Sequence, residues 1–278
     1  MNNKLNKPNP VFNVISTIIL AIITLLFIFP FYWVVTGSFK TRVDTVSLPP
    51  QWWPTNPTME SWTRLFKQPA WAWLFNSIFI AGVTMLLVCL VSTSAGYVLA
   101  KKRFYGDKLL FAMFVAAMAL PKQVVLVPLV RQINFMHFHN TLWAAILPAV
   151  GWPFGIFLMK QFSETIPTEL LEAAKIDGCS ELKTFSQIVI PMVKPGIAAL
   201  AIFTFISAWN DYFMQLIMLN SRAKLTLQLG LATLQGEFST DYGVLMAGAT
   251  FAAIPIIIIF VMFQKSFTQG ITIGAVKG

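Results

Sequence analysis

Six apolar segments of the chain have the length of a helix that crosses a bilayer. Four of them carry no charged residue over 32, 33, 28 and 23 positions, and their charged boundaries are Lys7 and Lys40, Lys67 and Lys101, Arg131 and Lys160, and Asp241 and Lys265. The other two, 109–130 and 197–219, are interrupted only by Lys122 and Asp211. Because a spanning helix needs about 20 mostly apolar residues, the pattern predicts six membrane-spanning helices.

The apolar runs are continuous, which favours helices over the alternating strands of a membrane barrel. We expect the six helices at 11–35, 72–99, 109–130, 142–162, 195–219 and 242–263. Pro121 and Pro128 should kink the third helix. The small residues at 92–96 should let the second helix approach a neighbour closely.

Composition agrees with a membrane location. Hydrophobic residues make up 56% of the 278 residues and charged residues only 11%, and the mean hydropathy is +0.69. Soluble domains carry about 25% charged residues. We therefore predict an all-α integral membrane protein, with an N-terminal tail at 1–10, a six-helix domain at 11–263 and a C-terminal tail at 264–278.

The distribution of lysine and arginine sets the orientation. With the N-terminus in the cytoplasm, twelve of these residues fall in inner segments and seven in outer ones, and the cluster 101–103 lies inside. Cytoplasmic loops carry the excess of positive charge, so we expect both tails to be cytoplasmic. The net charge of +9 then reflects topology, and no nucleic-acid partner is needed to explain it.

The sequence offers no catalytic or metal-binding constellation within the predicted spans. Cys89 and Cys179 lack the spacing of a metal site, and a membrane enzyme is therefore disfavoured. No glycine is followed directly by lysine, so the chain lacks this step of a phosphate-binding loop. We expect no cofactor on this chain, and any ATP and Mg must be bound by a separate subunit.

A polar insertion at 163–193 separates the fourth and fifth predicted helices. Pro167 suits the first turn of a helix over 168–176, and Gly178 suits the left-handed position that ends one. A second short helix should stop at Pro191. Because Ala173 and Ala174 have small side chains, this helix–turn–helix could dock against another protein. On the residues alone, a loop that caps the neighbouring helices is equally compatible.

The spacing within this insertion resembles the coupling loop of ABC importer permeases. The matching residues are Glu172, Ala173, Ala174, Gly178, Ile188 and Pro191, and Asp177, directly before Gly178, is expected to belong to the same ATPase contact. Ile190 departs from the leucine that the family more often has. The resemblance implies that a cytoplasmic ATPase grips this insertion.

Other segments resemble the maltose-type carbohydrate permeases. These are Asn76-Ser77, the stretch 101–104, Trp209-Asn210 and the tail 269–278. The outer segments 40–69 and 220–241 match poorly, and their role stays open. The resemblance implies a second permease subunit, two cytoplasmic ATPase subunits, an external solute-binding protein and a sugar substrate, in a bacterial-type inner membrane crossed several times. It also implies a second ATPase contact through the tail, at Gln269, Gly270, Gly274 and Lys277.

Helix five offers candidates for the translocation pathway, at Trp209, Asn210, Asp211 and Tyr212. A charge within a membrane helix usually faces a partner or a wet cavity, although Asp211 could equally lie at the outer interface. Trp209 and Asn210 suit sugar binding or packing, and the partner subunit can hold the substrate contacts instead. A permease for glycerol 3-phosphate or another small solute remains open, as does a secondary transporter, which would need a coupling-ion site.

Overall fold

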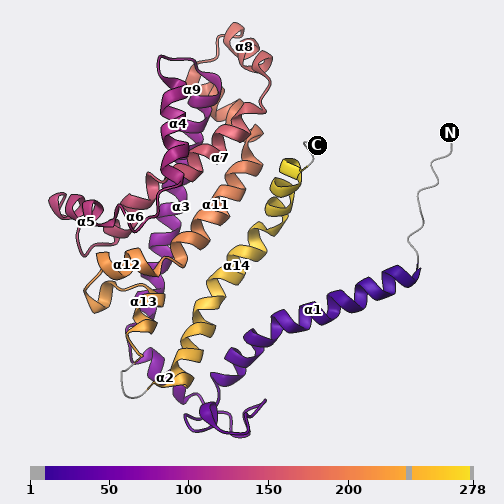
Figure 1. Ribbon diagram of the computed structural model, residues 1–278, viewed down its shortest axis with the longest axis vertical. Coiled ribbons are helices and arrows are strands. Elements are labelled where there is room, and N and C mark those ends of the chain that lie inside the picture. The colour runs from indigo at the N-terminus through magenta and orange to yellow at the C-terminus, as the bar shows by residue number, and fades with distance from the viewer. Residues whose placement is uncertain (1–9, 236–239, 276–278) are drawn as a thin grey trace. The chain divides into compact units, whose positions relative to one another are not determined.

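A computed structural model describes residues 10–235 and 240–275, with only the backbone given for 263–275. The described elements are helices, and a single antiparallel bridge pairs Gln235 with Thr240. The chain divides into two compact units: one holds residues 1–68 and 234–253, and the other holds 69–233 and 254–278 (Figure 1).

The first unit contains helix α1 (Pro10–Gly37), the short turn η1 (Asp44–Val46), α2 (Glu60–Phe66) and the first part of α14 (Tyr242–Ala275). The apolar side chains of α1 are not buried within the chain, as expected for a helix that faces lipid or another subunit.

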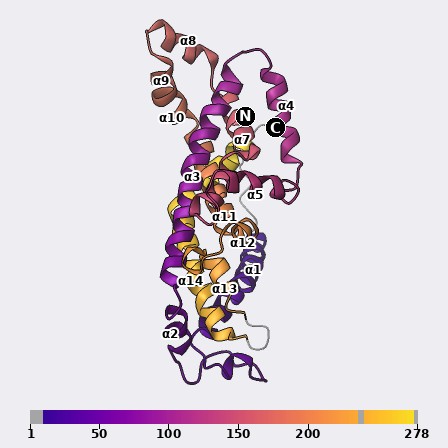
Figure 2. The same ribbon diagram turned by 90° about the vertical axis from the view of Figure 1, so that its left-hand side faces the viewer.

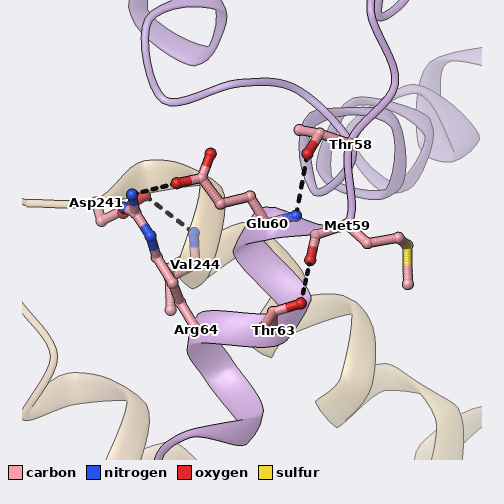
Figure 3. Close-up of polar contacts among 7 residues, drawn as sticks. All are labelled: Thr58, Met59, Glu60, Thr63, Arg64, Asp241 and Val244. Atoms are coloured by element: carbon pink, nitrogen blue, oxygen red, sulfur yellow. Dashed lines mark hydrogen bonds and ion pairs between the residues drawn. The ribbon is translucent and has the colours of Figure 1, made fainter.

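An ion pair ties α2 to the start of α14 across the first unit. Arg64 donates to Asp241 at 2.6 Å and also contacts Glu60 (Figure 3). The hydrogen bond to Asp241 raises the pKa of Arg64 above its ordinary value. Asp241 in turn accepts from the backbone N–H of Val244 at 3.3 Å, and it thereby caps the helix that follows.

The second unit is built around α3 (Ala70–Lys101). The helices α7 (Pro153–Glu164) and α11 (Lys194–Trp209) pack along it, as both views show (Figure 2). This unit also holds the later part of α14 and the short turn η3 (Arg222–Lys224). Its other α-helices are α4 (Asp107–Met118), α5 (Leu126–Phe135), α6 (Leu142–Val150), α8 (Thr168–Ile176), α9 (Glu181–Thr184), α10 (Ile190–Met192), α12 (Tyr212–Met218) and α13 (Leu227–Ala232).

Small residues set the distance between α3 and α7. A Cβ atom added at Gly96 would lie 2.6 Å from the backbone nitrogen of Lys160 and 2.7 Å from the carbonyl carbon of Met159. A Cβ at Gly155 would collide with the hydroxyl of Ser92. The predicted close approach through 92–96 is therefore confirmed, and it is of the kind that small residues permit between membrane helices.

The N-terminal part of α3 holds the segment that follows α12. Asn76 donates to the carbonyls of Ala223 and Leu225, both at 2.9 Å, and Ser77 accepts from the N–H of Leu227 at 2.8 Å. These bonds satisfy backbone groups around the start of α13. The pair Asn76-Ser77 therefore holds the start of α13 in place. The sequence analysis identified this pair only because it resembles the maltose-type permeases.

The predicted spans are only partly confirmed. Three described helices are long and apolar enough to cross a membrane, 11–37, 70–101 and 242–262, or five if each bent pair counts as one span. The pairs are 142–150 with 153–164, bent by 44°, and 181–192 with 194–209, bent by 76°. The predicted third span, 109–130, is not among them, since it is divided into α4 and α5 around Pro121 and each half is too short.

Two further boundaries differ from the prediction. The predicted fifth helix, 195–219, breaks into α11 and α12 at 210–211, where Asp211 caps the second piece. The sixth was predicted to end at 263, but α14 continues to Ala275, through most of the predicted C-terminal tail. The predicted tail at 1–10 lies almost wholly outside the described residues.

Gly96→Leu should destabilise the second unit, because the side chain must displace the backbone of α7; overpacking of this kind typically costs about 1–3 kcal/mol. Gly82→Leu is the matched control, since it lies in the same helix and a Cβ there meets nothing within 4 Å. Thermal unfolding of the full chain in detergent measures both. Equal melting temperatures for the two variants would contradict the proposed contact.

Candidate functional site

The polar insertion forms a helix, a turn and a second helix, and both views place α8 at the tip of the second unit near the C-terminal end of α3 (Figures 1 and 2). Helix α8 begins after Pro167, whose backbone is extended, and Glu169 lies in its first turn and Lys175 in its last. Both charges suit the helix dipole. The predicted helix over 168–176 is confirmed, with Pro167 immediately before its first residue.

The turn after α8 depends on Gly178, which has φ +74°. Its N–H donates to the carbonyl of Lys175 at 3.1 Å, and the N–H of Cys179 donates to that of Ala174 at 2.9 Å. This is the Schellman arrangement, in which glycine takes the left-handed position after the helix. A Cβ at Gly178 would meet nothing within 4 Å, so the turn projects into open space.

The second arm of the insertion is less regular than predicted. Ser180 accepts from the N–H of Lys183 at 3.4 Å and caps α9. A π-helical turn at Phe185–Val189 then leads into α10, which contains Pro191 and ends at Met192. π-Helical turns are rare and occur often at functional sites.

The structure places most of the candidate residues on the surface of the insertion. Glu172, Ala173, Asp177, Gly178 and Pro191 are exposed, and Ile188 is half-buried. Ala174 was expected to present a small side chain to a partner, but it is only 5% exposed and packs inside the chain.

Two apolar side chains that the sequence analysis did not single out flank the turn. Ile176 is 86% exposed, and Leu182 is also largely exposed. The sequence could have identified both residues, because each is an apolar side chain within a few positions of a charged turn. Exposed apolar groups beside a projecting turn are typical of a surface that another protein covers.

Two lysines at the end of α3 fix the insertion to the helices. Lys101 donates to the carbonyls of Ile166 at 2.6 Å and Glu164 at 3.3 Å. Lys102 donates to Glu181 at 2.7 Å, and this bond raises the pKa of Lys102 above its ordinary value. Sequence reasoning used these lysines only for orientation and resemblance, and it missed both contacts.

A buried apolar cluster continues this connection into the helices. It joins α3, α7, the insertion and α11, and its fully buried members are Val88, Tyr97, Met159, Ile166, Val189, Val193 and Leu200. Because cores are close-packed and transmit strain, a displacement of the insertion must move these three helices or break the cluster.

The pathway candidates do not form one site. Trp209 is 1% exposed and lies in the core, while Asn210 is exposed and donates to the carbonyl of Ile206 at 3.0 Å. Tyr212 is exposed. Only Asp211 lines a cavity of about 350 Å³, where its carboxylate is 4.0 Å from the ammonium of Lys122.

The C-terminal candidates are only partly described. Gln269, Gly270 and Gly274 lie in the last turns of α14, for which the backbone alone is given, and Lys277 lies outside the described residues. Among the described residues, no group of three histidine, cysteine, aspartate or glutamate side chains could hold a metal ion.

Known proteins resemble this chain over almost its full length. It is 32% identical over 276 residues to the arabinooligosaccharides transport system permease protein AraQ of Halalkalibacterium halodurans, covering 98% of this chain and 99% of that one. It is 30% identical over 254 residues to the diacetylchitobiose uptake system permease protein DasC of Streptomyces coelicolor, covering 90% and 92%.

A solved structure shares the fold. A chain of a bacterial ABC transporter involved in the import of the acidic polysaccharide alginate superposes with a TM-score of 0.82 at 21% identity, covering 94% of this chain and 98% of that one. Residues 92–273 match the model of the binding-protein-dependent transport system inner membrane component. The chain belongs to this family of ABC transporter permeases.

Proposed function

We propose that this chain is one of two permease subunits of an ATP-driven sugar importer and forms half of its translocation pathway. Support for a sugar comes from relatives whose names specify arabinooligosaccharides and diacetylchitobiose. As a membrane component of a transport system, the chain is a transport subunit and not an enzyme. ATP and Mg are bound by two cytoplasmic ATPase subunits, and an external binding protein delivers the sugar.

The observation that carries the mechanism is the projecting turn at Gly178. It presents exposed charged and apolar side chains at the end of a helix that the core holds firmly. Such a turn fits a cleft on an ATPase, with Glu172 and Asp177 at its rim and Ile176 as an apolar contact. The segment 269–278, with Gln269, Gly270, Gly274 and Lys277, supplies a second contact with the ATPase.

Closure of the ATPase pair on ATP then pushes the insertion. The lysine contacts and the apolar cluster pass this movement to α3, α7 and α11. These helices alternate the pathway between inward-facing and outward-facing states. In this proposal the chain crosses the membrane six times with both termini in the cytoplasm, and the insertion then lies on the side where ATP is available.

Substrate-stimulated ATP hydrolysis tests the sugar assignment. We expect the complete transporter with its binding protein to hydrolyse ATP faster with arabinooligosaccharides or diacetylchitobiose than with glycerol 3-phosphate. The measurement is phosphate release from reconstituted complexes. Stimulation by glycerol 3-phosphate alone would instead support a permease for that solute.

Gly178→Trp should uncouple ATP hydrolysis from uptake, because the indole would fill the cleft that receives the turn. Gly106→Trp is the matched control: Gly106 also has a positive φ, +86°, and open space around it. Both variants share the cost of a left-handed residue, about 1–2 kcal/mol. Sugar uptake per inserted protein should fall roughly tenfold or more, equivalent to about 1.4 kcal/mol, only for Gly178→Trp. Equal uptake by the two variants would contradict the docking role.

Lys101→Met should weaken the link between insertion and α3, since two carbonyls lose a charged donor, and such bonds contribute about 1.5–3 kcal/mol. Lys108→Met removes the same charge from an exposed position on α4. We expect more ATP hydrolysed per sugar imported in Lys101→Met than in Lys108→Met. Identical ratios would show that Lys101 does not transmit the movement.

A further inference from the structure

Three helix interruptions in the second unit meet at the cavity. Lys122 comes from the segment between α4 and α5, Trp152 from that between α6 and α7, and Asp211 from that between α11 and α12. Each interruption has a local cause. Pro121 ends the first helix region, Trp152 is extended before Pro153, and Asp211 caps α12 by accepting from the N–H of Met214 at 3.1 Å.

We propose that this cavity is a binding subsite for one unit of an uncharged saccharide, so that this chain itself contacts the substrate. The inference rests on the proposed function and specifies its substrate as neutral.

The charged pair is spaced for a bridging hydroxyl group. The 4.0 Å between Nζ of Lys122 and Oδ2 of Asp211 is within reach of an ion pair but too long for a hydrogen bond. Lys122 is an exposed residue and the Asp211 side chain is partly exposed. A sugar hydroxyl can accept from the ammonium and donate to the carboxylate at the same time, whereas a carboxylate ligand can only accept.

Trp152 gives the cavity an aromatic wall. The Nζ of Lys122 lies 5.1 Å from the centre of its ring, so the ring lies close to the charged pair. The C–H face of a sugar ring can pack on an aromatic ring while the sugar hydroxyls reach polar groups. Trp152 offers such an aromatic surface next to the polar pair.

Hydroxyl groups also line the cavity. Thr84, Thr204 and Ser207 come from α3 and α11. Thr84 is 1% exposed, and its hydroxyl has no hydrogen-bond partner among the described residues. Buried polar atoms nearly always find a partner, and a ligand hydroxyl in this cavity would supply one.

The balance of charge selects a neutral ligand. Lys122 and Asp211 are the charged residues of the cavity lining, and their charges cancel. An anionic sugar would place a negative charge next to the carboxylate of Asp211, and this repulsion weakens its binding. The volume of about 350 Å³ lies near the lower limit of small-molecule pockets, roughly 300–1,000 Å³, and this suits one sugar unit at a time.

Direct binding to the full chain in lipid nanodiscs tests this inference. The probes are arabinobiose and maltose as neutral disaccharides and digalacturonate as an anionic one, with tryptophan fluorescence as the readout. We expect saturable binding of at least one neutral probe and binding of digalacturonate at least about tenfold weaker. Trp152→Phe should remove most of the fluorescence change.

Asp211→Asn should weaken neutral binding by about tenfold, the effect of losing a charged hydrogen-bond partner, and should favour digalacturonate, since Lys122 is left unbalanced. Asp107→Asn is the matched control, because Asp107 lies at the start of α4 beside Arg103 and does not line the cavity. Lys122→Met should instead weaken digalacturonate further. Size-exclusion chromatography and helical circular dichroism confirm folding of every variant.

Three results would overturn the inference: no saturable binding of either neutral probe, equal affinity for digalacturonate, or the same preference in Asp211→Asn and Asp107→Asn. The proposed function fails separately. Sugar binding without ATP-dependent uptake by the complete transporter would contradict only the importer role. Uptake whose preference is unchanged in Trp152→Phe and Asp211→Asn would contradict only the subsite.

Discussion

Contact between the backbones of α3 and α7 is the constraint on which the second unit depends. Gly96 lies against the backbone of Met159 and Lys160, and Gly155 lies against Ser92, so neither helix can shift without its partner. Lipid provides no hydrophobic force between helices, and close packing of small residues is what holds them. The insertion joins this pair through a shared apolar cluster and through Lys101. A rigid pair attached to a projecting turn is suited to transmit force.

The interruptions between helices have a different role from the rigid α3–α7 contact, since they bring polar side chains to a cavity among apolar helices. Continuous membrane helices satisfy their own backbone and present apolar side chains. Helices α4, α6 and α11 end shortly before Lys122, Trp152 and Asp211, and these three residues line a common cavity. The same chain therefore combines a rigid helix contact at Gly96 with irregular backbone at the cavity. Membrane proteins tolerate irregular backbone where it lines a cavity.

Local chemistry explains what the sequence predicted. The Gly178 turn and α8 followed from helix-ending rules that act within a few residues, and the small residues at 92–96 acted as expected. The helix breaks at Trp152 and Asp211 were not predicted, because both segments are apolar over the length of a full span. Pro153 and the aspartate cap at Asp211 were the local signals that a helix ends there. The contacts of Lys101 and Lys102 join positions 65 and 79 residues apart, and no local pattern specifies them. The cavity combines residues from seven helices and the segments between them, so of the candidates at 209–212 only Asp211 was foreseen.

An ATPase that covers the insertion should shield a cysteine placed at its turn from chemical labelling. In a variant with Cys89 and Cys179 replaced by serine, Ile176→Cys is labelled with a maleimide in the presence and absence of the ATPase subunits. Tyr105→Cys, on the exposed turn after α3, is the reference. We expect the ATPase to protect position 176 and to leave position 105 reactive. Equal labelling of position 176 with and without the ATPase would contradict the account.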